Sequence, residues 1–343
     1  MPQPFVVQPR VSQGVSSTPQ RGEGIRRHVE RSHFAEIPAL RPLVRWLSDP
    51  ETTDVFVNGA DGLFVDRGNG AERVPQWRAS VDDVRELAVA LIGLGGRHLD
   101  DATPCADVRL ESGMRVHAVL APVAPAGATI SIRVPRFDAP DLDELQRRGA
   151  FDAAQRAHLE EIVVRRRNVL ITGSAGSGKT TLLAAMLQRA VASDRIVTIE
   201  DVAELAISHP HHVRLEARQS NLEGAGGVGL AQLVREALRM RPDRLVVGEC
   251  RGAEVRELLS ALNTGHDGGA GTLHANSLRD VPARLEALGS LAGLDDRALA
   301  RQAASGLDTV IHLERTREGL RRIAGFGTPA VEDGRLVISE DSR

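Results

Sequence analysis

The stretch that most constrains this chain is Gly173-Ser-Ala-Gly-Ser-Gly178-Lys179-Thr180, which has the pattern G-x-x-x-x-G-K-[ST] of a phosphate-binding P-loop. Glycine lets the backbone curl so that its N–H groups point inward at an anion. In such a loop the lysine reaches the β- and γ-phosphates, and the next hydroxyl holds Mg²⁺. The residues predicted to bind nucleotide are Gly173, Ser174, Ala175, Gly176, Ser177, Gly178, Lys179, Thr180 and Thr181.

The flanks of the loop are those that the motif requires. Residues 168–172 are an apolar run that predicts a buried strand, and residues 179–192 are good helix formers. The helix start adds the positive end of its dipole at the phosphate position. Lys179 is also the only lysine in the chain. All other Lys/Arg positions are arginine, so lysine stands at the one position where a compact ammonium group has to fit a phosphate-binding loop.

Bulk composition limits the class of protein. A length of 343 residues predicts about two domains, and a net charge of −3 excludes a general nucleic-acid polycation. Cys105 and Cys250 form no CxxC pair, which favours a reducing, cytosolic setting. No apolar run reaches the roughly 18–20 residues that span a bilayer. We therefore expect a cytoplasmic protein that lies at the inner face of the plasma membrane only through a partner.

The order of patterns along the chain predicts two domains. Residues 1–35, rich in Pro, Gln, Ser and Arg, predict a flexible arm, and residues 36–136 predict a small α+β domain. In that domain Ser80, with Asp83 three residues on, predicts the start of a helix that runs through Leu94. Prolines and acidic residues indicate a linker over 137–150. Alternating helices and strands make 151–343 an α/β domain. Its expected strands are 168–172, 195–200, 212–216, 244–248 and 270–274, and its expected helices are 153–167, 179–192, 229–239, 252–263 and 279–289.

Two groups of carboxylates follow predicted strands of the α/β domain. Glu249 ends the apolar run 244–248, a position where a carboxylate contacts Mg²⁺ or orients the attacking water. Glu200, Asp201 and Glu204 end another strand, where carboxylates near a triphosphate favour a metal-linked or water-positioning role. An ordinary negatively charged surface is the alternative for both groups. We expect Glu249 to polarise water, with Thr180, Glu249 and Asp201 around Mg²⁺.

Histidines follow the glycine-rich stretch 265–271, with His274 at the end of a predicted strand. Imidazole can donate to a γ-phosphate or respond to its loss. Zinc is the alternative, although no thiol lies near. A second group at positions 209, 211 and 212 could bind metal, but a solvated loop is the expected interpretation. Arginines could stabilise charge that develops during phosphoryl transfer. The candidates in or just after the first domain are Arg109, Arg115, Arg133 and Arg136, and those that flank the Glu249 strand are Arg239, Arg241 and Arg251.

Four stretches in a fixed order resemble the secretion ATPases of type II and type IV systems. They are the P-loop, Thr198-Ile-Glu-Asp-Val-Ala-Glu-Leu205, the stretch 238–252 and the stretch 263–277. Among these ATPases the chain is most similar to the Tad/Flp pilus-assembly and conjugation-associated group. The second and fourth stretches resemble that family's "Asp box" and "His box", and the third its atypical Walker B motif. The resemblance covers roughly residues 40 to 325.

The resemblance implies a RecA-like P-loop domain and a homo-hexameric ring, with Mg-ATP bound between the two domains of each subunit. It implies catalytic roles for Glu249, Glu200, Glu204 and His274, and a nucleotide contact for Arg133. Arg239 or Arg241 would act on a neighbouring subunit. The implied partner is an inner-membrane platform protein of a pilus or secretion system.

Three functions remain open at this point. The first is an ATP-hydrolysing motor of a secretion or pilus-assembly machine. The second is a motor that moves DNA in conjugation. It has less support, because the aromatic side chains on which DNA bases could stack make up only 3% of the chain. The third is a nucleotide-dependent scaffold that hydrolyses little.

Overall fold

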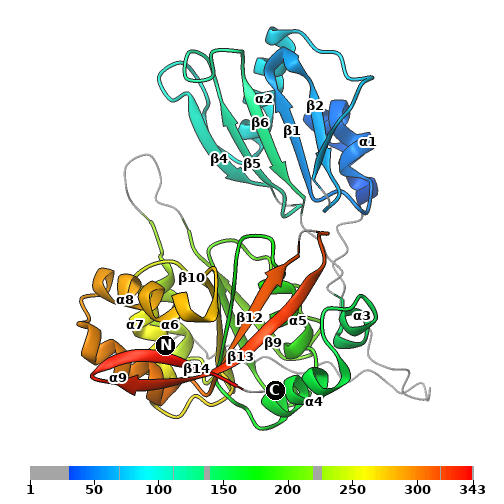
Figure 1. The fold of residues 1–343 in the computed structure, drawn as a ribbon. Helices are drawn as coiled ribbons and strands as arrows, with labels where there is room; N and C mark the ends of the chain where they lie inside the picture. The colour runs from blue at the N-terminus through cyan, green and yellow to red at the C-terminus, as the bar shows by residue number, and fades with distance from the viewer. Residues whose placement is uncertain are drawn as a thin grey trace, which may run out of the picture.

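The chain forms two β-sheets in separate lobes, and Figure 1 shows the smaller lobe above the larger one. The structure is a computed structural model that describes residues 31–68, 70–110, 112–134, 140–218, 226–316 and 318–341. Most of the predicted N-terminal arm, residues 1–30, lies outside the described residues.

The first lobe is a six-stranded antiparallel sheet with the order β3-β2-β1-β6-β5-β4. Alternate side chains of the strands point to one face and pack against helix α2, as in β1, where Val55 and Val57 are buried. The predicted start of α2 is confirmed, because Ser80 and Asp83 form a reciprocal capping box. The elements are α1 Val44–Leu47, α2 Val81–Leu94, β1 Asp54–Asn58, β2 Leu63–Asp66, β3 Ala71–Arg73, β4 Cys105–Arg109, β5 Arg115–Val119 and β6 Thr129–Arg133, with 3₁₀ turns at Arg31–Glu36, Pro38–Leu43 and Gly59–Asp61.

The second lobe is an eight-stranded sheet with the order β14-β13-β12-β7-β11-β10-β8-β9. The six strands from β12 to β9 in this order run parallel, and β13 and β14 add an antiparallel hairpin. The strands are β7 Val169–Gly173, β8 Ile196–Glu200, β9 His212–Glu216, β10 Arg244–Cys250, β11 Ala270–His274, β12 Thr309–Arg315, β13 Arg321–Glu332 and β14 Arg335–Glu340.

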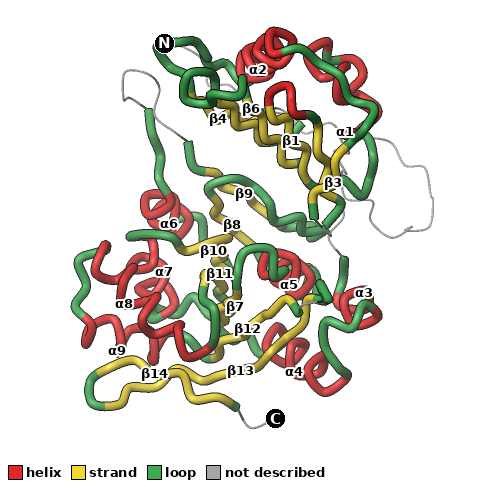
Figure 2. The backbone as a smooth tube through the Cα atoms, turned by 45° about the horizontal axis from the view of Figure 1, so that its top comes forward, coloured by secondary structure: helices red, strands yellow, loops and turns green. Residues whose placement is uncertain are grey.

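Helices cover both faces of this second sheet, as Figure 2 shows. Helices α6 to α9 pack on one face, and α3 to α5 pack on the other. All five residues of β7 are buried, which is why the sequence of this strand is a continuous apolar run. The helices are α3 Leu142–Arg147, α4 Ala153–Val164, α5 Lys179–Leu187, α6 Leu230–Leu238, α7 Glu254–Leu262, α8 Val281–Leu291 and α9 Asp296–Gly306, with a 3₁₀ turn at Leu278–Asp280.

The structure differs from the sequence prediction in the segment 137–150. Helix α3 lies there, because Asp141 caps it by accepting a hydrogen bond from the backbone N–H of Glu144 at 2.8 Å. Leu142 is completely buried in the core of the second lobe. Acidic composition and prolines indicated a linker, whereas this short helix is held by one cap and one buried leucine. Residues 137–139 lie outside the described part of the chain.

Among the described residues, no helix has the length and apolar character needed to cross a bilayer.

Candidate active site

The carboxyl ends of four parallel strands carry the predicted chemistry. Strand β7 ends at Gly173, β8 at Glu200, β10 at Cys250 and β11 at His274. Because these strands run parallel and are neighbours in the sheet, their ends lie along one edge. The fold therefore brings together residues that are up to about a hundred positions apart in the sequence.

The P-loop connects β7 to α5 through backbone conformations that favour glycine. Gly173, Gly176 and Gly178 have φ angles of 150°, 70° and 97°. A Cβ on Gly173 would lie 2.4 Å from the carbonyl oxygen of Leu313 and 2.6 Å from the hydroxyl of Ser177. A Cβ on Gly176 would meet no atom within 4 Å, so the outer side of the loop is open. This loop fits a phosphate group approaching its backbone N–H groups.

The side chain of Lys179 is held inside the loop. Only 6% of the residue is exposed, and Nζ donates hydrogen bonds to the carbonyl oxygens of Gly173 and Ser174 at 3.0 and 2.9 Å. Burial lowers the pKa of Lys179, and the negative charge of Glu249 acts in the opposite direction. The ammonium therefore lies where a phosphate bound by the loop would meet it.

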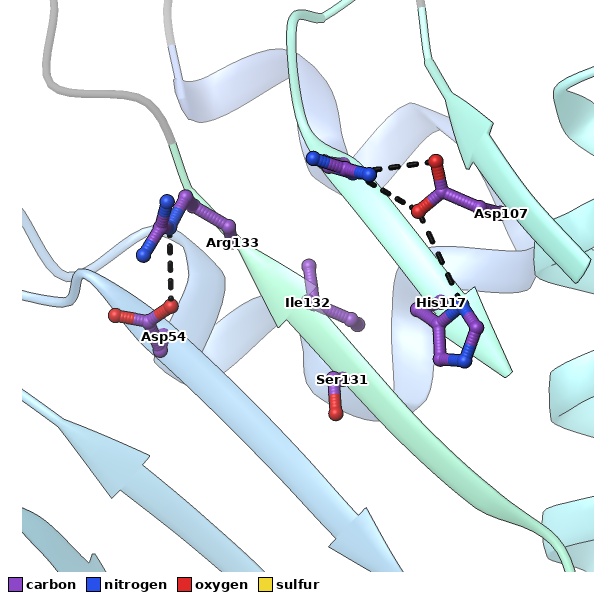
Figure 3. A pocket seen from close by; sticks show the side chains of 7 residues that line it. Asp54, Asp107, His117, Ser131, Ile132 and Arg133 are labelled. Carbon is purple, nitrogen blue, oxygen red and sulfur yellow. Dashed lines mark hydrogen bonds and ion pairs between the residues drawn. The ribbon is translucent and has the colours of Figure 1, made fainter. Parts of the chain in front are cut away.

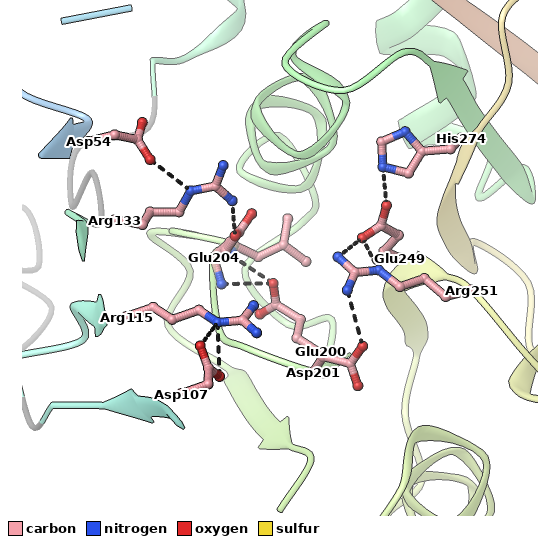
Figure 4. Close-up of polar contacts among 11 residues, drawn as sticks. Asp54, Asp107, Arg115, Arg133, Glu200, Asp201, Glu204, Glu249, Arg251 and His274 are labelled. Atoms are coloured by element: carbon pink, nitrogen blue, oxygen red, sulfur yellow. Dashed lines mark hydrogen bonds and ion pairs between the residues drawn. The ribbon is translucent and has the colours of Figure 1, made fainter. Parts of the chain in front are cut away.

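His274 connects Lys179 to Glu249, and Figure 4 shows its ring pointing at the glutamate. Its Nδ1 lies 3.3 Å from Nζ of Lys179, and its Nε2 contacts Oε1 of Glu249. Since the ammonium can only donate, Nδ1 is the acceptor and Nε2 carries the proton toward Glu249. Burial, followed by the charge of Lys179, lowers the pKa of His274, so the neutral ring is favoured. Three predicted site residues thus lie in one series of contacts, from Lys179 to His274 and from His274 to Glu249.

Arg251 holds the two carboxylates that we predicted as metal ligands. Its Nε donates to Oε2 of Glu249 at 2.5 Å, and its Nη1 lies 3.7 Å from Oδ2 of Asp201. Within the described part of the chain, no group of three or more His, Cys, Asp or Glu side chains could hold a metal ion. Mg²⁺ in nucleotide sites is bound by one or two carboxylates together with phosphate oxygens, and the set of Thr180, Glu249 and Asp201 stays a prediction.

Glu200 is buried beneath the loop that follows β8, with 4% of the residue exposed. Its Oε1 accepts hydrogen bonds from the backbone N–H groups of Glu204 and Leu205, both at 2.9 Å. Burial raises the pKa of Glu200, partly offset by these two bonds. A Cβ on Gly248 would lie 2.6 Å from Cγ of Glu200, which explains glycine at that position of β10. The carboxylate thus shapes the loop that carries Asp201 and Glu204.

Arginines of the first lobe face these carboxylates across the junction of the two lobes. Nη1 of Arg133 lies 3.2 Å from Oε1 of Glu204, while its Nε lies 3.4 Å from Asp54 of its own lobe. A second ion pair joins Arg109 to Glu216. Figure 4 shows the guanidinium of Arg133 between Asp54 and Glu204.

A cavity of about 200 Å³ opens beside Arg133 on the first lobe. Figure 3 shows its charged lining, with Asp107 beside His117 and Asp54 beside Arg133. Nε of Arg115 donates to Oδ1 of Asp107 at 2.9 Å. The attraction of Asp107, with smaller contributions from Glu204 and Asp201, raises the pKa of Arg115. The lining residues are Asp54, Asp107, Arg115, His117, Ser131, Ile132 and Arg133.

Arg241 is not brought to this site. It is exposed, has a φ angle of 52° and precedes β10, whereas Glu249 lies near the other end of that strand. A strand of this length spans about 20 Å at roughly 3.3 Å per residue. Any contact between Arg241 and a nucleotide would therefore involve the site of another subunit.

The histidines at 209, 211 and 212 have separate partners. Nε2 of His212 lies 2.9 Å from the Thr198 hydroxyl, and burial lowers its pKa to about 4. Nε2 of His211 lies 2.7 Å from Arg195, and Nε2 of His209 lies 3.1 Å from the carbonyl oxygen of Val191. The three rings thus form no metal site, and His212 is part of the sheet rather than a solvated loop.

Sequence reasoning named Arg251 only as one of several arginines that could stabilise charge, and it did not name Arg321. Arg251 follows Glu249 by two residues, so its place at the end of an apolar strand was the available signal. Nε of Arg321, in β13, donates to the carbonyl oxygen of Gly176 at 2.9 Å. No local pattern indicated Arg321, because the strands after residue 307 were not predicted.

Comparison with known proteins agrees with this arrangement. Residues 38–320 match the family described as Type II/IV secretion system protein. A putative conjugal transfer protein of Mycobacterium tuberculosis is 50% identical over 303 residues, which cover 87% of this chain and 85% of the relative. VirB11 of Agrobacterium fabrum is 31% identical over 302 residues, covering 79% of this chain and 87% of the relative.

Two solved structures share the fold. The pilus retraction motor PilT with bound ADP has a TM-score of 0.59 and 19% identity, and covers 89% of this chain and 84% of its own. DotB of Legionella pneumophila, described as an ATPase, has a TM-score of 0.57 and 22% identity, with coverages of 82% and 78%. The expected RecA-like P-loop domain behind a small α+β domain is therefore confirmed. The chain belongs to the type II/IV secretion system protein family.

Proposed function

We propose that this protein hydrolyses Mg-ATP at the junction of its two lobes and uses the cycle to drive a secretion or pilus-assembly machine of the Tad/Flp kind. The observation that carries the proposal is the continuous series of contacts from Lys179 through His274 to Glu249 at the open side of the P-loop. A cation for the phosphates and a carboxylate for the water are thus linked by one imidazole.

The roles of the residues follow from their positions. The loop backbone and Lys179 bind the phosphates, and Mg²⁺, when bound near Thr180, supplies charge neutralisation. Glu249 orients the attacking water and accepts its proton, and His274 holds Glu249 in place through Nε2. Arg251 donates to Glu249 and lies beside Asp201, so its guanidinium holds the two carboxylates near each other.

The proposed movement of the first lobe relative to the second depends on the contact of Arg133 with Glu204. This pair joins the lobes, and Arg133 is 62% exposed at its side chain, so the bond is weak in water and easily exchanged. A triphosphate with a higher negative charge than Glu204 would compete for the same guanidinium. Exchange of Arg133 between Glu204 and nucleotide would change how the first lobe sits on the second.

The assembly that we propose is a homo-hexameric ring at the inner face of the plasma membrane, held there by a membrane platform protein. Arg241 is exposed and precedes β10, at the end of that strand away from Glu249, so its position suits contact with a neighbouring subunit rather than with its own nucleotide. The exported substrate would be a pilin or another secreted protein.

The testing experiment measures ATP hydrolysis and particle size for wild type and Lys179→Ala, with and without a non-hydrolysable ATP analogue. Hydrolysis by wild type, its loss with weaker nucleotide binding in Lys179→Ala, and a ring of six subunits would support the proposal. Equal hydrolysis rates in both proteins would reject the site, and a monomer at all nucleotide concentrations would reject the ring.

A conjugation motor is the second candidate, since the relative from M. tuberculosis carries the description of a putative conjugal transfer protein. Single-stranded DNA that stimulates hydrolysis, with a steep decline as salt rises, would favour it over protein export. Unchanged hydrolysis in the presence of DNA would leave the secretion function as the better account.

A further inference from the structure

His312 is a buried histidine for which the proposed mechanism has no role. It lies in β12 with 5% of the residue exposed, directly opposite Thr172 of β7 in the register of the sheet. Its Nδ1 lies 2.9 Å from the hydroxyl of Thr172, which is completely buried. Thr172 is the residue before Gly173, where the P-loop begins. One side of the ring is therefore bonded to the base of the P-loop.

The other side of the ring contacts the chain that leaves β11. The backbone of Asn276, two residues beyond His274, is a hydrogen-bond partner of the His312 ring and raises its pKa against the larger effect of burial. Since Thr172 occupies Nδ1, the ring nitrogen left for Asn276 is Nε2. The Thr172 hydroxyl lies 2.9 Å from Nδ1 and 3.3 Å from the carbonyl oxygen of Ile311, and with Nε2–H toward Asn276 the hydroxyl donates to Nδ1. Burial lowers the pKa of His312, which agrees with this neutral tautomer.

The strand order explains why this ring can reach both partners. β7 lies between β12 and β11, and Figure 2 shows the three strands side by side. In the register, Thr172 pairs with Leu273 on one side and with His312 on the other, while Gly173 pairs with His274. The ring of His312 thus crosses β7 at its carboxyl end and meets the segment that follows β11.

We propose that His312 is a positioning residue for ATP hydrolysis, which ties the segment after His274 to the strand that opens the P-loop. This inference rests on the proposed function. His274 can touch both Lys179 and Glu249 only while the end of β11 keeps its place beside Gly173. Through Asn276 and Thr172, His312 fixes these two strand ends relative to each other. It touches neither nucleotide nor water itself.

Two substitutions separate the two sides of the ring. In His312→Gln the amide reaches the position of Nε2 and keeps a donor for Asn276, and in His312→Asn it reaches the position of Nδ1 and keeps only the contact with Thr172. We expect His312→Gln to retain kcat within about threefold of wild type. We expect His312→Asn to lose about tenfold or more in kcat, since small misplacements of catalytic groups are costly. KM and the Kd of a fluorescent ATP analogue should change less than about twofold in both, since the P-loop is intact.

His212 supplies a matched control, because it forms the same 2.9 Å histidine–threonine contact with Thr198 in the same sheet, away from the P-loop. His212→Asn should lower Tm as much as His312→Asn does, yet leave kcat within about twofold. Equal kcat in His312→Asn and His212→Asn would overturn the inference, as would failure of Gln to do better than Asn at position 312. A wild type that does not hydrolyse ATP would instead overturn the proposed function and this inference with it.

Discussion

Gly248→Ala is the substitution whose effect can be worked out most fully from the structure. Position 248 follows the Val247–Ile199 pair in the register of β10 and β8, so it lies beside Glu200. The added Cβ would lie 2.6 Å from Cγ and 3.1 Å from Oε1 of Glu200. Real Cβ contacts are essentially never that short, so Glu200 has to move.

The magnitude follows from what Glu200 holds. Forcing an extra methyl into a packed site costs about 1–3 kcal/mol. Moving the carboxylate also weakens its two 2.9 Å bonds with the backbone N–H groups of Glu204 and Leu205. We expect a loss of about 2 kcal/mol in the free energy of unfolding, which lowers Tm by roughly 4–8 °C for a domain of this size. Turnover should fall by about tenfold or more, because Asp201 and Glu204 shift with the loop.

The assay combines thermal unfolding with steady-state hydrolysis at saturating ATP. Gly93→Ala is the control, because a Cβ there meets no atom within 4 Å and the position is inside helix α2. It should be neutral or stabilising by up to about 1 kcal/mol, since alanine is the better helix former. Wild-type Tm and turnover in Gly248→Ala would refute the reasoning that Glu200 fills the space of a side chain at 248.

Two further predictions concern charge. Arg133→Ala should change stability by less than about 1 kcal/mol, because the ion pair is exposed. It should raise the KM for ATP about tenfold or more, because it removes a charged hydrogen bond to the nucleotide. An unchanged KM would show that Arg133 does not contact the nucleotide. His212 has its pKa lowered from 6.5 to about 4, mainly by burial, so the unfolded chain takes up a proton before the folded one does. Stability should therefore fall as pH decreases from 6.5 toward 4, by on the order of 2 kcal/mol after allowance for partial exposure. Denaturant unfolding of His212→Gln should show a smaller fall over this range. Identical pH profiles for the two proteins would contradict the assignment of this pH dependence to His212.

The sequence patterns that predicted structure best were those that correspond to one local structure only. The P-loop at 173–180 has its expected strand and helix, and the capping box at Ser80 starts α2 where predicted. Strands β8, β10 and β11 lie within three residues of their predicted bounds, because buried parallel strands are nearly continuous apolar runs.

The parts that sequence reasoning missed depend on long-range pairing. Strands β12 to β14 follow the last predicted helix, and with them come Arg321 on the P-loop and His312 beside Thr172. Neither residue has a neighbour in sequence that explains it, because each is defined by a partner more than 130 positions away. The burial of Glu200 likewise depends on Gly248 in an adjacent strand, which no local pattern indicates.

The central claim is that Glu249 readies water for attack on a nucleotide that Lys179 holds. The most direct test is a single-turnover measurement of ATP cleavage in Glu249→Gln, together with the Kd of ATP. The account predicts ATP binding within about threefold of wild type and a cleavage rate lower by on the order of 10²-fold or more, the scale of a lost general base. Cleavage at the wild-type rate with ATP fully bound would contradict it.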